Sequence, residues 1–139
     1  MMDISTLKTL FLTTVFMLLG CLEIQAQTFI LPPTGYPMTI KLDEAGTLPD
    51  RITKNELYKI SKLKIIGEIN GTDLRVIREM AGKDAWGNDT DGILSVLDLS
   101  EARIVKGGDY WIYGNDYSTS KDKIGYCLFD GCSGLTSIT

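Results

Sequence analysis

The chain has 139 residues, with 14 lysines and arginines against 18 aspartates and glutamates, and it contains no histidine. A net charge of −4 argues against binding to a nucleic-acid backbone, which requires a basic surface. The missing histidine excludes histidine-based catalytic triads, histidine metal ligands and histidine switches near neutral pH. Because three cysteines are too few for a disulfide scaffold, we expect one small domain held together by its core.

Residues 1–26 have the features of a signal peptide. Lys8 precedes an apolar run at residues 10–19, and this run is shorter than the ~20 residues that span a bilayer. Cleavage after Ala26 is favoured, because a polar segment leads up to that small residue. The alternative is a lipobox ending at Cys21, and only acylation there would attach the protein to a membrane. Either processing route predicts a secreted or outer-surface protein.

The mature chain is expected to begin with a linker at residues 27–37, which holds three of the four prolines. Residues 38–59 follow as an N-terminal cap. In the cap, residues 38–42 alternate between apolar and polar as a half-buried strand does, and residues 43–46 form a turn. Residues 47–52 predict a short helix with Thr47 as its N-cap.

The clearest predicted helix spans residues 72–81. Thr72 is expected to cap it, and Asp73 lies favourably at the positive end of its dipole. Leu74, Ile77 and Ala81 share one face, and Gly82 is expected to end the helix.

Three segments match the strand pattern of a leucine-rich repeat. They are Ile60-x-x-Leu63-x-Ile65, then Leu94-x-x-Leu97-x-Leu99, and finally Leu135-x-x-Ile138. Their spacing is unequal, so we expect irregular repeats with loop insertions over residues 60–139.

The last sixteen residues carry a more specific pattern, I-x(4)-F-x-x-C-x-x-L-x-x-I. Its positions are filled by Ile124, Phe129, Cys132, Leu135 and Ile138. The pattern resembles the repeat of BspA-type bacterial surface leucine-rich-repeat proteins, and the likeness extends back to about residue 38. This resemblance implies an α/β fold, namely a leucine-rich-repeat solenoid with an N-terminal cap and a short parallel sheet, truncated after about two repeats. A short helical turn would bury Phe129 and Cys132.

The longest insertion, residues 106–123, holds the candidate ligand surface: Tyr110, Trp111, Tyr113 and Tyr117. Exposed aromatic rings with a polar tip suit sugar rings or protein contacts. The alternative is that the four rings fold back over the cap and cover the edge of the sheet.

Three other groups of residues are candidate sites. Residues 88–92 suggest a calcium loop, but Gly87 stands where the first aspartate must be, so a polar turn is expected and no metal is predicted. Cys127 and Cys132 are poorly spaced for a disulfide in a helical turn, and the match of Cys132 to the buried cysteine of the repeat favours a packed thiol there. Asp98 and Glu101 are expected to be solvated carboxylates rather than an acid/base pair.

The sequence therefore predicts a non-catalytic protein without a cofactor. The resemblance implies adhesion to host matrix proteins or to other cells, which makes a protein the expected partner. The alternative is a structural cap, or a fragment of a longer repeat protein, with no ligand of its own. The apolar residues Leu135 and Ile138, in an exposed C-terminal strand, also predict self-association.

Overall fold

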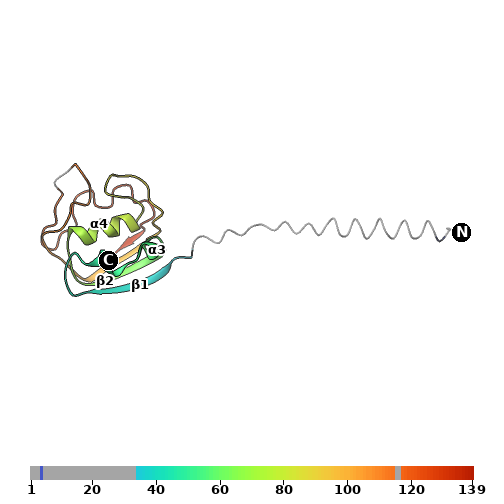
Figure 1. Cartoon of the computed structure of the whole chain (residues 1–139), viewed down its shortest axis with the longest axis horizontal. Coiled ribbons are helices and arrows are strands. Elements are labelled where there is room, and N and C mark those ends of the chain that lie inside the picture. The colour runs from blue at the N-terminus through green and yellow to red at the C-terminus, as the bar shows by residue number, and fades with distance from the viewer. Residues whose placement is uncertain (1–3, 5–33, 115–116) are drawn as a thin grey trace. The chain divides into compact units, whose positions relative to one another are not determined.

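A computed structural model of the chain describes Ile4, residues 34–114 and residues 117–139 (Figure 1). The chain divides into two units, residues 1–32 and residues 33–139, and the second unit contains the sheet described below. The predicted signal peptide, apart from Ile4, and residues 27–33 of the predicted linker lie outside the described residues. Among the described residues, no helix has the length and apolar character needed to cross a membrane.

The second unit is built on a small parallel sheet. Its strands are β1 (Tyr36–Leu42), β2 (Ile60–Ile69), β3 (Val96–Ile104) and β4 (Ser137–Ile138), in the order β1-β2-β3-β4. The prediction of an α/β fold with a short parallel sheet is confirmed at this level. The first strand starts earlier than predicted, because Tyr36 and Pro37, assigned to the linker, belong to β1. A proline is tolerated there because β1 is an edge strand.

The strand register brings equivalent positions of the three sequence patterns together. Leu63 lies opposite Leu97, and Leu97 lies opposite Ile138. The buried side chains of the first three strands point to one face of the sheet, where they form much of the core: Ile40, Leu42, Ile60, Leu63, Ile65, Ile69, Leu97 and Ile104.

Helix α4 (Gly71–Met80) lies on the buried face of the sheet (Figure 1). Leu74 and Ile77 are buried in the core as predicted, as is Ala81, and Gly82 ends the helix with φ of +107°. The predicted cap is wrong by two residues, since Asn70 accepts a hydrogen bond from the Thr72 backbone N–H at 3.0 Å. Asn70 holds this position because its own backbone is extended, whereas Thr72 already lies inside the helix.

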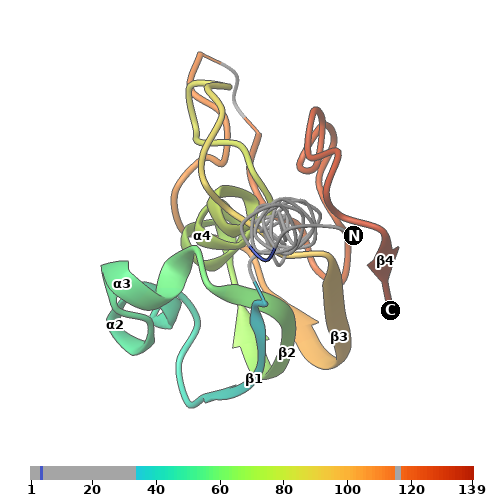
Figure 2. The same cartoon turned by 90° about the vertical axis from the view of Figure 1, so that its right-hand side faces the viewer.

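Two one-turn helices, α2 (Leu48–Arg51) and α3 (Lys54–Leu57), lie beside α4 (Figure 2). Helix α2 forms where predicted, but Thr47 does not cap it, because its hydroxyl donates to the Glu44 carbonyl at 2.7 Å. Helix α3 was not predicted, although Thr53 and Glu56 form the reciprocal capping box that marks a helix start.

The described residues between β3 and β4 form loops rather than helices. The helical turn predicted to bury Phe129 and Cys132 is a series of tight turns, and only Cys132 is buried. Leu128 fills the core beside it, and Phe129 is half-buried. Ile124 and Ile138, the outer positions of the repeat pattern, are exposed.

Candidate functional site

Two of the four predicted surface aromatics turn inward. Trp111 is only 1% exposed, its ring stacks on Tyr117 with centroids 6.1 Å apart, and its Nε1 donates to the Tyr126 carbonyl at 3.2 Å. Gly125 lies flat against the indole, and a side chain there would collide with the ring. Of the two expectations for these rings, Trp111 therefore follows the one in which they fold back, and it is not part of an exposed surface. The ring folds back onto the domain because an indole buries a large apolar area while its N–H finds a partner.

The other two predicted residues, Tyr110 and Tyr113, are exposed. Tyr113 does not stand alone, because its ring lies against Trp86 with centroids 4.2 Å apart. The Trp86 side chain is 73% exposed, which is unusual for so large an apolar group. The Arg75 guanidinium lies over the other ring of the pair, 4.7 Å from the Tyr113 centroid. We call Arg75, Trp86 and Tyr113 the aromatic tip.

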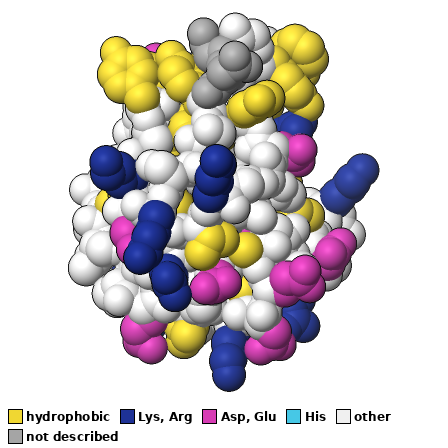
Figure 3. Space-filling view, turned by 90° about the vertical axis from the view of Figure 1, so that its left-hand side faces the viewer, with side chains coloured by type: hydrophobic (Ala, Val, Ile, Leu, Met, Phe, Trp, Pro, Cys, Tyr) yellow, Lys and Arg dark blue, Asp and Glu magenta, His cyan; other side chains and the backbone are white. Residues whose placement is uncertain are grey.

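The aromatic tip joins two loops that are distant in sequence. Figure 2 shows the loop after α4 and the loop after β3 side by side at the top of the molecule, and the Tyr113 backbone N–H donates to the Ala85 carbonyl at 2.8 Å. In the space-filling view, hydrophobic side chains gather at the top of the face shown, whereas charged side chains are scattered below (Figure 3). The exposed apolar groups are thus concentrated at one end of this face.

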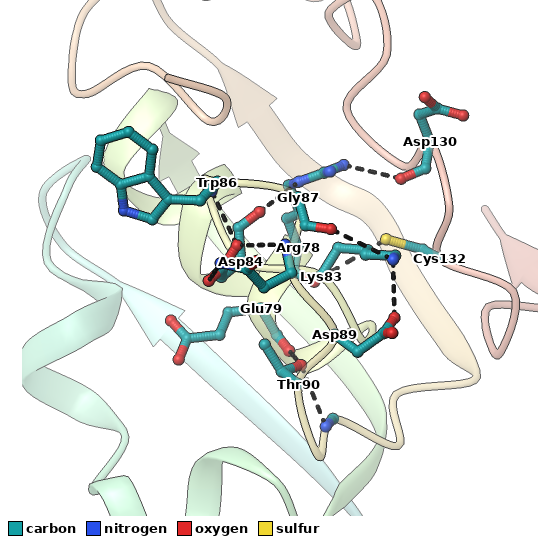
Figure 4. A network of polar contacts seen from close by, with 12 residues as sticks. Arg78, Glu79, Lys83, Asp84, Trp86, Gly87, Asp89, Thr90, Asp130 and Cys132 are labelled. Atoms are coloured by element: carbon teal, nitrogen blue, oxygen red, sulfur yellow. Dashed lines mark hydrogen bonds and ion pairs between the residues drawn. The ribbon is translucent and has the colours of Figure 1, made fainter. Parts of the chain in front are cut away.

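A carboxylate fixes the turn that carries Trp86. Asp84 accepts hydrogen bonds from the backbone N–H groups of Trp86 and Asn88, both at 2.8 Å, and from the Asn88 amide at 3.0 Å (Figure 4). These bonds, with the Asn88 side chain foremost, lower the pKa of Asp84, so the carboxylate is ionised when it holds the turn.

The calcium-loop candidate, residues 88–92, is a polar turn in which the side-chain oxygens of Asp89 and Thr90 bond to protein groups. Asp89 pairs with the Lys83 ammonium at 2.7 Å, and the Thr90 hydroxyl donates to the Glu79 carbonyl at 2.6 Å (Figure 4). In the part of the chain that the structure describes, no cluster of histidine, cysteine or acidic side chains has the arrangement needed to hold a metal ion.

Arg78 connects α4 to the turn at Asp84 and to the loop that precedes β4. The side chain is buried, and its Nε donates to the Asp84 carbonyl at 3.2 Å. Its Nη1 reaches three further carbonyls, those of Cys127 (3.3 Å), Leu128 (2.6 Å) and Asp130 (3.2 Å). A buried cation is stable only when polar groups, here the four carbonyls, replace its hydration. Arg78 therefore has a structural role and connects α4 to these loops.

The two cysteines of the described region are free thiols. Burial raises the pKa of Cys132, whose Sγ lies 4.0 Å from the Arg78 carbonyl oxygen. A thiol held in its protonated form is a poor nucleophile, which agrees with the packed thiol predicted at this position.

Asp98 and Glu101 lie on the sheet face opposite α4, on either side of Lys64. The Lys64 ammonium contacts Glu101 at 2.6 Å and Asp98 at 3.6 Å. Hydrogen bonds from Ser100, followed by the charge of Lys64, lower the pKa of Asp98. A general acid needs a raised pKa, so this arrangement is that of an ion-paired surface rather than an acid/base pair.

Trp86 and Arg75 belong to the site but were not predicted from the sequence. Trp86 lies in a polar, turn-rich stretch that lacks the apolar periodicity of a helix or strand. A single large aromatic residue in such a stretch is the one feature of the sequence that points to an exposed ring. Arg75 was placed correctly on a helix, but its position over Tyr113 depends on a loop 38 residues further along the chain.

Comparison with known proteins does not assign this chain to a group. No protein-family model matches it, and no curated protein matches it significantly.

Proposed function

We propose that this protein is a non-catalytic, exported binding module that contacts a protein partner through the aromatic tip. The observation that carries this proposal is the Trp86–Tyr113 pair, which is exposed to solvent and lies beside the Arg75 guanidinium. Tryptophan, tyrosine and arginine are the residues that most often dominate the binding energy of protein interfaces.

The tip is also arranged in advance of binding. The backbone hydrogen bond from Tyr113 to Ala85 joins the two loops, and Arg75 forms an ion pair with Asp109, at 3.9 Å between Nη1 and Oδ2. Side chains that are already ordered lose less entropy on association, so a small surface of this kind favours binding.

The test is to measure binding of the purified chain to a panel of immobilised extracellular-matrix proteins and to intact cells. For a partner that binds the native chain, the double variant Trp86→Ala/Tyr113→Ala is expected to bind at least about tenfold more weakly, because hot-spot truncations cost about 2 kcal/mol or more. Tyr36→Ala is the matched control, since it removes an exposed tyrosine from β1. Equal binding by the double variant and the control would reject the aromatic tip as the contact surface.

Export is a separate part of the proposal and depends on residues 1–26. Expression in a bacterial host, followed by N-terminal sequencing of the exported product, is expected to give Gln27 as the first residue. A lipid-modified Cys21 would instead indicate a membrane-anchored lipoprotein, and an intact Met1 in the cytoplasmic fraction would reject export.

The alternative function is that of a structural cap in a longer repeat protein of the BspA type. The alignment of Leu63, Leu97 and Ile138 across neighbouring strands supports this alternative, because a repeat array stacks equivalent residues in this way. Reading the DNA beyond the codon for Thr139 tests it. Further units of the same pattern would support the cap, and a stop codon would favour the binding module.

A further inference from the structure

A pocket between the two short helices and α4 has no part in the aromatic tip. It has a volume of about 380 Å³, which lies within the range of small-molecule sites. Its apolar wall comes from all three helices and the turn between the short ones, with Ile52, Leu57 and Val76 among its members.

One side of the pocket carries a carboxylate with a fixed orientation. The Tyr58 hydroxyl donates to Glu79 Oε1 at 2.6 Å, and both residues line the pocket. No described hydrogen bond or ion pair uses the second carboxylate oxygen of Glu79. In Figure 4 the Glu79 carboxylate points away from the Lys83–Asp89 pair.

The charged groups that act on Tyr58, the hydrogen-bond partner of this carboxylate, are all acidic. The hydrogen bond to Glu79, followed by burial, raises the pKa of Tyr58 to about 12, and the charges of Asp91 and Asp84 act in the same direction. Lys54 also lines the pocket, but it is exposed and forms no ion pair within the described residues. An exposed ammonium is screened by water, so the oriented Glu79 carboxylate decides the charge of the ligand that fits.

We infer that this pocket binds a small primary amine with an apolar body. The body would lie against Ile52, Leu57 and Val76, and the ammonium group would donate to Glu79. This inference does not depend on the proposed function, because the aromatic tip contributes nothing to the pocket.

The test compares two ligands that differ mainly in charge, 2-phenylethylamine and 3-phenylpropanoate, by NMR titration of the isotope-labelled full chain. The amine is expected to bind and to shift the amide signals of Ile52, Leu57 and Val76. Glu79→Gln is expected to weaken amine binding by about tenfold, because a hydrogen bond to a charged group becomes a neutral one. Lys54→Gln is expected to strengthen it slightly, and Glu44→Gln, at an exposed turn, is the matched control.

Each contrary outcome overturns the inference. Preferential binding of 3-phenylpropanoate, lost in Lys54→Gln, would assign the pocket to an acid. Equal amine affinity in Glu79→Gln and the native chain, with matching melting curves, would remove the carboxylate from the site. Absence of binding by either ligand at millimolar concentration would show that the pocket is only a surface hollow.

Discussion

Asp73 shows how one buried side chain can join two helices. Its carboxylate accepts hydrogen bonds from the backbone N–H groups of Gly46 (2.6 Å), Leu48 (2.9 Å) and Asn70 (2.8 Å). Leu48 is the first residue of α2, Gly46 lies in the turn before it, and Asn70 is the N-cap of α4. The residue is 0% exposed, so water cannot replace these bonds if the carboxylate is removed.

Asp73→Ala is therefore expected to lower the free energy of unfolding by about 3 kcal/mol or more, because each buried donor left without a partner costs about 1–3 kcal/mol. Urea unfolding followed by circular dichroism measures the change. Asp50→Ala is the control, since Asp50 is exposed in the first turn of α2 and is expected to change stability by no more than about 0.5 kcal/mol. A loss below about 1 kcal/mol for Asp73→Ala would contradict this account.

At the scale of elements, α4 organises the unit because its faces serve different purposes. Leu74 and Ile77 pack on the sheet, and Asp73 caps α2. Arg75 supports the aromatic tip, and Arg78 holds the loops that follow. Loops without regular structure of their own are thus fixed by side chains from one helix.

Replacing Arg78 by methionine is expected to loosen those loops more than it disturbs the sheet. Methionine retains the apolar volume but leaves four carbonyl groups without their donor, which predicts a loss of about 2–4 kcal/mol. Hydrogen exchange is expected to accelerate most in residues 84–90 and 127–132. Arg51→Met, which removes an exposed arginine, is the control. Uniform acceleration across β1 to β3 would show that Arg78 supports the whole fold rather than these loops.

At the scale of the whole molecule, the distribution of titrating groups sets the dependence of stability on pH. The pKa values of Glu56, Asp84 and Asp98 are lowered, mainly by hydrogen bonds from Thr53, Asn88 and Ser100 respectively. A lowered pKa in the folded state contributes stability that is present above the ordinary carboxyl pKa and is lost as pH falls through the lowered value. The chain has no histidine to titrate between pH 5 and 7.

The urea midpoint is therefore expected to be nearly constant from pH 5 to 7 and to fall below about pH 4, where carboxyl groups are protonated. At the alkaline end, the raised pKa of Tyr58, about 12, predicts a loss of stability as pH rises from 10 through 12. Tyr58→Phe is expected to reduce the loss of stability above pH 10. It is expected to leave the fall of the urea midpoint below about pH 4 unchanged. A midpoint that changes strongly between pH 5 and 7 would contradict this account.

Much of the fold could be predicted because its signals are local. Leucines and isoleucines at strand spacing place β2 and β3, and the 72–81 pattern places α4 to within one residue at each end. Asp73 was predicted at the start of that helix, but its bonds to the α2 backbone could not be predicted, because 25 residues separate it from Leu48.

The candidate site was harder to predict, because exposure is not a local property. Trp111 and Tyr113 are two residues apart in the same insertion, yet one is buried and the other is exposed. The difference arises because Gly125 and Tyr126 offer Trp111 a flat surface and a carbonyl, whereas Tyr113 meets Trp86 from another loop. Composition identified the aromatic stretch but could not distinguish these two surroundings.

The sequence by itself determined the strands, the main helix and the acidic, histidine-free chemistry of this protein. These follow from residue types and short-range periodicity, which act within a few residues. Only the tertiary structure decided which aromatic rings face solvent, which carboxylate caps two helices and where a buried arginine finds its carbonyls. Those outcomes depend on contacts between segments tens of residues apart, and the packing of the whole unit fixes them together.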